Sequence, residues 1–222
     1  SYPRALRNVL GAEGLVQNGI SGQFFLPAPS ATQTIEATVQ VLGGDEVPIA
    51  PNESGSDVAL LEHVKWFHEL TDQQSLELGG SSWISNADHQ LYGLDATYKW
   101  KPFVAGESRS FLISGELYAA NLDDSAVSDH PNGWYVWSQY QFSQNVYFGV
   151  RFDQAREVSD DDLVTNTIGA YLTYYTTEFL RFRLGVEHAD SDVDTLDGRN
   201  TALLELNFIY GSHPVEPYWV NK

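Results

Sequence analysis

The feature that most constrains this chain is the alternation of apolar and polar residues in segments of about ten residues. In the segment 91–100, for example, one set of alternate positions holds Leu94 and Tyr98, and the other set holds Asp95 and Lys99. Successive side chains of a β-strand point to opposite faces of the sheet, so such a segment has one apolar and one polar face. A length of about ten residues is also what a tilted strand needs to cross a bilayer.

The same alternation recurs along the whole chain. It is clear in the segments 91–100, 111–118, 145–153, 180–187 and 202–210, and less regular in 19–27, 33–42, 58–69, 75–84, 133–142 and 165–175. We therefore predict an all-β fold, an antiparallel transmembrane β-barrel with about eleven strands in this chain. The segment 58–69 is the most ambiguous, because Leu60, Leu61, Val64 and Phe67 would also suit one face of a helix.

The connections between these segments differ in length in a regular way. Short turns follow residues 69, 142 and 175, whereas longer stretches cover 42–58, 119–133, 154–165 and 188–200. Outer-membrane barrels have short periplasmic turns and longer extracellular loops, and a soluble sandwich has no reason to sort its loops in this way. This pattern predicts that the C-terminus lies in the periplasm. It also places much of the negative charge outside, in Asp123, Asp124, Asp129, Asp160, Asp161, Asp162, Asp190, Asp192, Asp194 and Asp197.

The strand count has a consequence for the start of the chain. Single-chain bacterial barrels have even numbers of strands, so eleven implies either that an N-terminal part of a larger barrel is missing or that one strand is miscounted. We treat residues 1–222 as one barrel region. The stretch Ser1 to Asn18 is expected to be a loop or short helix that enters from the outer side, with Ala5, Leu6, Val9 and Leu10 as its apolar residues.

Aromatic residues gather near the predicted strand ends, as at Tyr98 and Trp100, Trp134 and Tyr135, Tyr174 and Tyr175, and Tyr210. Tyrosine and tryptophan favour the membrane–water interface because each has an apolar body and a polar tip. The alternative is an ordinary β-core that is rich in aromatic residues.

Composition excludes several classes of function. The net charge of −18 would repel the phosphates of nucleic acid. The absence of Cys excludes a disulfide framework, a zinc–thiolate site and a cysteine nucleophile. The chain also lacks a nucleophile-elbow sequence and a phosphate-binding glycine loop, so we do not expect an enzyme.

Several segments resemble a known family. Residues 91–102 (LYGLDATYKWKP), 115–118 (GELY), 133–135 with 139–142 (GWY, QYQF) and 206–214 (LNFIYGSHP) are similar to strand-and-turn segments of porin-like outer-membrane proteins of Gram-negative bacteria, some labelled TonB-dependent receptor-like. The resemblance covers the range 75–214, as the C-terminal portion of such a barrel. It implies a bacterial outer-membrane location and gives no substrate. The chain departs from the family pattern because it continues to Lys222 instead of ending on an aromatic residue.

The charged residues on the polar faces of the predicted strands are the candidate pore lining, because charges on the lipid face would be costly. They are Asp95, Lys99, Glu116, Arg151, Asp153, Arg181, Arg183, Glu187 and Glu205. Two interpretations are open. Arg151, Arg181 and Arg183 could form a basic stripe that selects anions. Equally, these arginines could pair with neighbouring carboxylates and brace the barrel.

A metal site has little support. Asp190, Asp192 and Asp194 offer oxygens at alternate positions, as calcium loops do, but the glycine and glutamate of an EF-hand are missing. A loose site for a divalent cation such as calcium is one hypothesis, and a solvated acidic loop is the other. His63 and His68 should point to opposite faces of a strand, which makes them poor joint ligands.

The sequence therefore favours an outer-membrane barrel that acts as a porin-like channel for passive diffusion of small hydrophilic solutes. No cofactor is expected, and the partners expected are outer-membrane lipid and lipopolysaccharide. The alternative is a structural or partner-binding barrel whose acidic extracellular loops hold a protein partner or a divalent cation.

Overall fold

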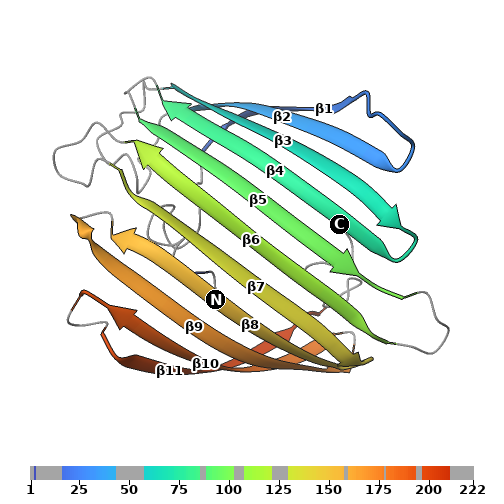
Figure 1. The fold of residues 1–222 in the computed structure, drawn as a ribbon, viewed down its shortest axis with the longest axis vertical. Coiled ribbons are helices and arrows are strands. Elements are labelled where there is room, and N and C mark those ends of the chain that lie inside the picture. Colours follow the sequence, from blue (N-terminus) through green and yellow to red (C-terminus); the bar gives the residue numbers. More distant parts are fainter. Residues whose placement is uncertain are drawn as a thin grey trace.

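The computed structural model describes residue 3 and residues 17–43, 58–85, 89–102, 108–121, 130–157, 160–177, 179–193 and 197–210. These residues form eleven β-strands in one antiparallel sheet, in which each strand pairs with the next one along the chain. The sheet is strongly curved, with β1 at one edge and β11 at the other (Figure 1). The predicted all-β antiparallel fold is confirmed. Within these ranges, no helix combines the length and the apolar character that a membrane crossing demands.

The strands are β1 (Gly19–Leu26), β2 (Gln33–Gly43), β3 (Val58–Thr71), β4 (Gln74–Ser85), β5 (Gln90–Trp100), β6 (Ser110–Asn121), β7 (Asn132–Ser143), β8 (Val146–Glu157), β9 (Asp160–Thr177), β10 (Leu180–Ser191) and β11 (Arg199–Phe208). Each predicted segment corresponds to one strand. The helical alternative for 58–69 is wrong, because that segment lies within β3 and pairs with β2 on one side and β4 on the other.

The register assembles the alternating residues of separate strands into two continuous faces. Leu94 lies opposite Leu117, and Leu117 lies opposite Trp134. One position further along, Asp95 lies opposite Glu116, which lies opposite Tyr135. Because paired residues of neighbouring strands point to the same side, these two rows lie on opposite faces of the sheet. We call the face with Leu94 the outer face and the face with Asp95 the inner face.

Burial distinguishes the two faces sharply. In the described part of the chain, every buried strand residue belongs to the inner face, including Trp83, Arg151 and Asp153. On the outer face, Leu94 and Leu184 are each 57% exposed, even though they lie in the middle of their strands. Many other large apolar residues on that face are also exposed, from Ile20 in β1 to Leu204 and Phe208 in β11. The outer face is therefore a predominantly apolar surface that nothing in the described chain covers.

The connections are sorted by length less cleanly than we predicted. The long connections after β2, β6 and β10 do start from strand ends at one end of the sheet, but β8 and β9 at the same end are separated by only residues 158–159. Asp160, Asp161 and Asp162 therefore belong to β9 and not to a long loop, and Asp190 belongs to β10. Polar residues continue these strands because the backbone pairing, as at Arg156 opposite Val164, does not require apolar side chains.

At the opposite end, the connection 101–109 between β5 and β6 is longer than a tight turn. The expectations for 1–18 and for the tail after residue 210 fall almost entirely outside the described residues.

The aromatic residues near the strand ends lie only partly where we predicted them. Tyr98 and Tyr174 lie on the outer face near one end of their strands, and Trp134 lies on that face near the other end. The Trp134 indole N–H donates to Gln154 at 3.2 Å. However, Tyr135 and Tyr175 point to the inner face, because sequence neighbours in a strand face opposite ways.

Candidate functional site: the charged inner face

All of the predicted pore-lining residues lie on the inner face. Asp95 and Lys99 come from β5, Glu116 from β6, Arg151 and Asp153 from β8, Arg181, Arg183 and Glu187 from β10, and Glu205 from β11. Their side chains form two groups that differ in how the charges are paired.

The first group, which we call the braced wall, consists of Arg151, Asp153, Tyr171 and Glu187 on β8, β9 and β10. The Arg151 Nε donates to Asp153 Oδ2 at 2.9 Å, and its Nη2 donates to Glu187 Oε1 at 3.0 Å. The Tyr171 hydroxyl donates to the same Glu187 oxygen at 2.5 Å. The guanidinium carbon also lies 5.6 Å from the centroid of the Tyr171 ring. Arg151 is 7% exposed and Asp153 is fully buried, so this charge pairing is shielded from water.

Glycines make the braced wall possible. Gly169 lies between Arg151 and Glu187 in the same cross-strand row, so no side chain at position 169 separates them across β9. A Cβ at Gly169 would come within 2.5 Å of the Tyr171 hydroxyl oxygen, and one at Gly185 within 2.7 Å of the Tyr171 ring. Gly169 and Gly185 therefore leave space for the Tyr171 side chain and for the ion pair between Arg151 and Glu187.

A second ion-pair cluster lies further along β10. Arg181 and Arg183 share Glu205 on β11, with the Arg183 Nη1 at 3.6 Å from Glu205 Oε2 and the Arg181 Nη2 in contact with Oε1. The Arg183 Nε also donates to Thr173 Oγ1 at 3.3 Å. Each of the three arginines that we predicted as a basic stripe thus lies against a carboxylate. The bracing interpretation describes their arrangement better than an unpaired basic stripe does.

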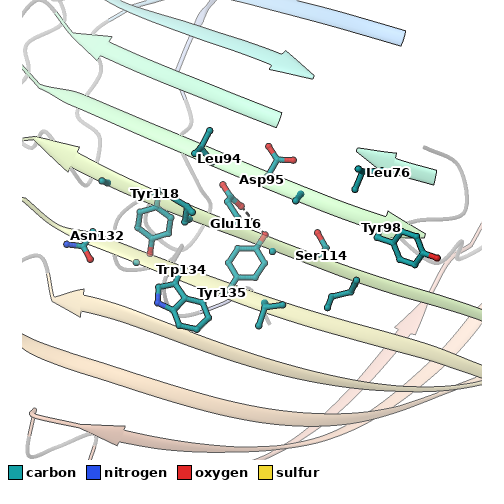
Figure 2. A pocket seen from close by; sticks show the side chains of 17 residues that line it. Leu76, Leu94, Asp95, Tyr98, Ser114, Glu116, Tyr118, Asn132, Trp134 and Tyr135 are labelled. Carbon is teal, nitrogen blue, oxygen red and sulfur yellow. Dashed lines mark hydrogen bonds between the residues drawn. The ribbon is translucent and has the colours of Figure 1, made fainter. Parts of the chain in front are cut away.

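On the other side of the inner face, carboxylates predominate. We call this region the acidic wall and define it by Glu36, Glu77, Asp95 and Glu116, on β2, β4, β5 and β6. Asp95 and Glu116 lie directly opposite each other in the register. Glu116 accepts a hydrogen bond from the Tyr135 hydroxyl at 2.9 Å, as the dashed line in Figure 2 shows.

The cations of the acidic wall lie at longer range. The His63 Nε2 is 3.8 Å from Asp95 Oδ2, and the Lys65 Nζ is 3.8 Å from Glu36 Oε1. These four side chains are 19–34% exposed, so water weakens both pairs. Lys99 lies on the same face of β5, two rows from Asp95.

The proposed divalent-cation residues do not converge in the described chain. Asp190 points to the outer face, opposite Asn166, while Asp192 Oδ2 accepts the backbone N–H of Val164 at 3.0 Å. Asp194 lies outside the described residues. Among the described residues, no group of three or more metal-ligating side chains has a geometry that could hold an ion.

Three functional side chains were missed by the sequence analysis. His63 was considered only as a metal ligand, and Tyr135 and Tyr171 were not recognised as inner-face hydrogen-bond donors. The alternation alone could have placed all three on the polar face. Their partners could not have been deduced, since these depend on which residues the register brings together.

A groove of about 770 Å³ lies over β5, β6 and β7 (Figure 2). Most of its lining is apolar and belongs to the outer face, with Leu94, Ile113, Leu117 and Trp134 around the small Gly115. It is therefore not a binding site for a polar solute.

Comparisons with known proteins give a consistent but distant picture. No protein-family model matches the chain, and no curated protein matches it. Two solved structures, described as "KdgM porin" and "KdgM porin in complex with disordered oligogalacturonate", are 10% and 11% identical to it. For both, the TM-score is 0.40, and 88% of this chain and 95% of the other are covered. A third, described as "Unveiling the Mechanism Behind the in-meso Crystallization of Membrane Proteins", is 13% identical, with a TM-score of 0.47 over 93% of this chain and 81% of the other.

The TonB-dependent receptor part of the predicted resemblance has no support among these matches. At such low identity and TM-score, the likeness to porins carries no weight for function, so the function has to follow from the two faces of the sheet.

Proposed function

We propose that this chain is the wall of a bacterial outer-membrane β-barrel that lets small hydrophilic solutes diffuse passively, with a preference for cations over anions. The observation that carries the proposal is the contrast between the two faces. Soluble monomers rarely expose contiguous apolar patches larger than a few hundred Å². The outer face exposes large apolar side chains along every strand from β1 to β11, as a surface in contact with lipid would.

The inner face supports the channel part of the proposal. It carries nearly all the charged side chains of the strand interiors, and these charges would be costly against lipid, so the inner face fits the polar interior of a barrel. The cation preference follows from the pairing. The arginines of β8 and β10 are engaged by carboxylates, whereas Asp95 and Glu116 face each other, with His63 3.8 Å from Asp95.

Reconstitution into a planar bilayer tests this function. The purified protein should give stepwise conductance, and a salt gradient should give a reversal potential of the sign expected for cation selectivity. A well-folded protein that never conducts would refute the channel. Conductance with clear anion selectivity would refute the role of the acidic wall but leave the channel in place.

The lipid contact can be tested separately with two adjacent residues of β11. Leu204 is on the outer face and 79% exposed, whereas Leu203 is on the inner face opposite Gly185. Leu204→Arg should destabilise the protein folded in lipid vesicles by about 2–4 kcal/mol, the cost of a lipid-facing arginine near the bilayer midplane. Leu203→Arg is the matched control, and it should have the smaller effect because its charge can reach water. Equal effects would contradict the assignment of the faces.

A further inference from the structure

The inner face carries an apolar patch at the end of the sheet where β2 and β4 finish. It consists of Leu42, Ala59, Leu61, Trp83 and Leu91, which lie side by side on β2 to β5. Trp83 and Ala59 are each 1% exposed, and Leu42 and Leu91 are 8% and 9% exposed. These four side chains are shielded from water on a face that elsewhere carries charges, so other parts of the chain must pack over them.

Gln17 indicates what covers the patch. This residue precedes β1, yet its Oε1 accepts the indole N–H of Trp83 on β4 at 3.0 Å. Its Nε2 donates to the carbonyl of Gly43 at the end of β2 at 3.2 Å, and the next residue, Asn18, accepts the Gly43 N–H at 2.7 Å. The Gln17 side chain therefore reaches from β2 to β4 across the end of β3. Gln17, immediately before β1, thus lies over the inner face of the sheet.

The preceding sequence has the composition that this surface requires. Leu6, Val9 and Leu10 are spaced as one apolar face of a helix turn would be, which suits the patch around Trp83. Arg4 and Arg7 are basic in a chain whose net charge is −18, and the neighbouring acidic wall offers carboxylates to such residues.

We propose that the apolar patch is the docking surface of the chain's own segment before Gln17, residues 4–16. This docking does not rest on the proposed function. Gln17 acts as a positioning residue that directs the segment onto the patch.

Chemical cross-linking tests the docking directly, because the chain contains no native Cys to interfere. In the folded protein, the pair Val9→Cys and Leu61→Cys should be joined efficiently by a short bismaleimide. The control pair Val9→Cys and Ser75→Cys places the second thiol on the same face but at the opposite end of β4, and it should not be joined. No cross-link in the first pair, or equal yields in both, would overturn the proposal.

Protection of the patch gives an independent readout. A Leu91→Cys thiol should react several-fold faster with a water-soluble maleimide when residues 1–16 are deleted, and moderately faster in full-length Gln17→Ala. An unchanged reaction rate in both would also overturn the docking.

Discussion

The braced wall and the acidic wall use similar residue types but hold their charges differently. In the braced wall, Arg151 is buried and meets two carboxylates at 2.9 and 3.0 Å, with Tyr171 packed beside it. In the acidic wall, the His63–Asp95 and Lys65–Glu36 pairs are 3.8 Å apart and partly exposed, and Asp95 and Glu116 face each other. Closely paired, buried charges fix the shape of a wall, whereas loosely paired, exposed charges leave an electrostatic field for a passing ion. We infer that the first wall mainly stabilises the sheet and the second mainly sets selectivity.

The largest difference between the walls should appear when one cation is removed from each. Arg151→Met takes the arginine away from the buried Asp153 and the half-buried Glu187, and breaking such a buried pair costs about 3–5 kcal/mol. Lys65→Met removes the partner of Glu36 at a wetter site, where the loss should stay within about 1 kcal/mol. Denaturant titration of both variants in detergent micelles measures these free energies of unfolding. Losses of the same size in both would remove the distinction between the walls.

A triple variant tests whether uncompensated carboxylate charge causes the loss of stability in Arg151→Met. Adding Asp153→Asn and Glu187→Gln to Arg151→Met eliminates the stranded carboxylate charges, so it should recover part of the lost stability. No recovery would mean that the single variant acts through lost packing and not through an uncompensated charge.

A smaller effect should follow from filling the space around Tyr171. In Gly185→Ala, the new Cβ would lie 2.7 Å from the Tyr171 ring, and overpacking of this kind costs about 1–3 kcal/mol. The matched control, Gly80→Ala on β4, meets only Leu94 at 3.4 Å, an ordinary contact, and should be nearly neutral. Adding Tyr171→Ser to Gly185→Ala should make the glycine substitution nearly neutral as well. A full penalty without the tyrosine would show that the glycine is needed for another reason.

The smallest change in stability, but the clearest in selectivity, is expected on the acidic wall. Glu116→Gln removes one of two opposed carboxylates, so the protein should be unchanged or more stable by about 0.2–1 kcal/mol. The reversal potential in a salt gradient should move towards zero because the cation preference weakens. Glu205→Gln, which leaves Arg181 and Arg183 without their shared carboxylate, should move it in the same direction but lower the stability. A stronger cation preference in Glu116→Gln would contradict the assigned role of the acidic wall.

The sequence predicted the faces well because alternation is a local property. The positions of Asp95 and Leu94 on opposite faces follow from their being neighbours in a strand, whatever the rest of the chain does. The same rule was overlooked for Tyr135 and Tyr175, which were grouped with Trp134 and Tyr174 although they point the other way.

The pairing of charges could not be predicted, because it depends on register between strands. Arg151 and Glu187 are 36 positions apart along the chain. They meet only because the register places both in one cross-strand row with Gly169. A shift of two residues between β8 and β9 would keep every side chain on its face and still separate the pair. The ends of β8 and β9 were misjudged for a related reason. Backbone pairing carries these strands into a polar sequence that contains Asp160, Asp161 and Asp162.

The central claim is that the outer face of the sheet lies in lipid while the inner face contacts water, and spin-label accessibility along β11 tests it most directly. Because the chain has no Cys, single cysteines at positions 202 to 207 give one label each. In vesicles, labels at 202, 204 and 206 should be relaxed mainly by oxygen, which concentrates in lipid. Those at 203, 205 and 207 should be relaxed mainly by a water-soluble nickel complex, with a period of two residues. Labels that show no alternation, or that are all accessible to the nickel complex, would contradict the account.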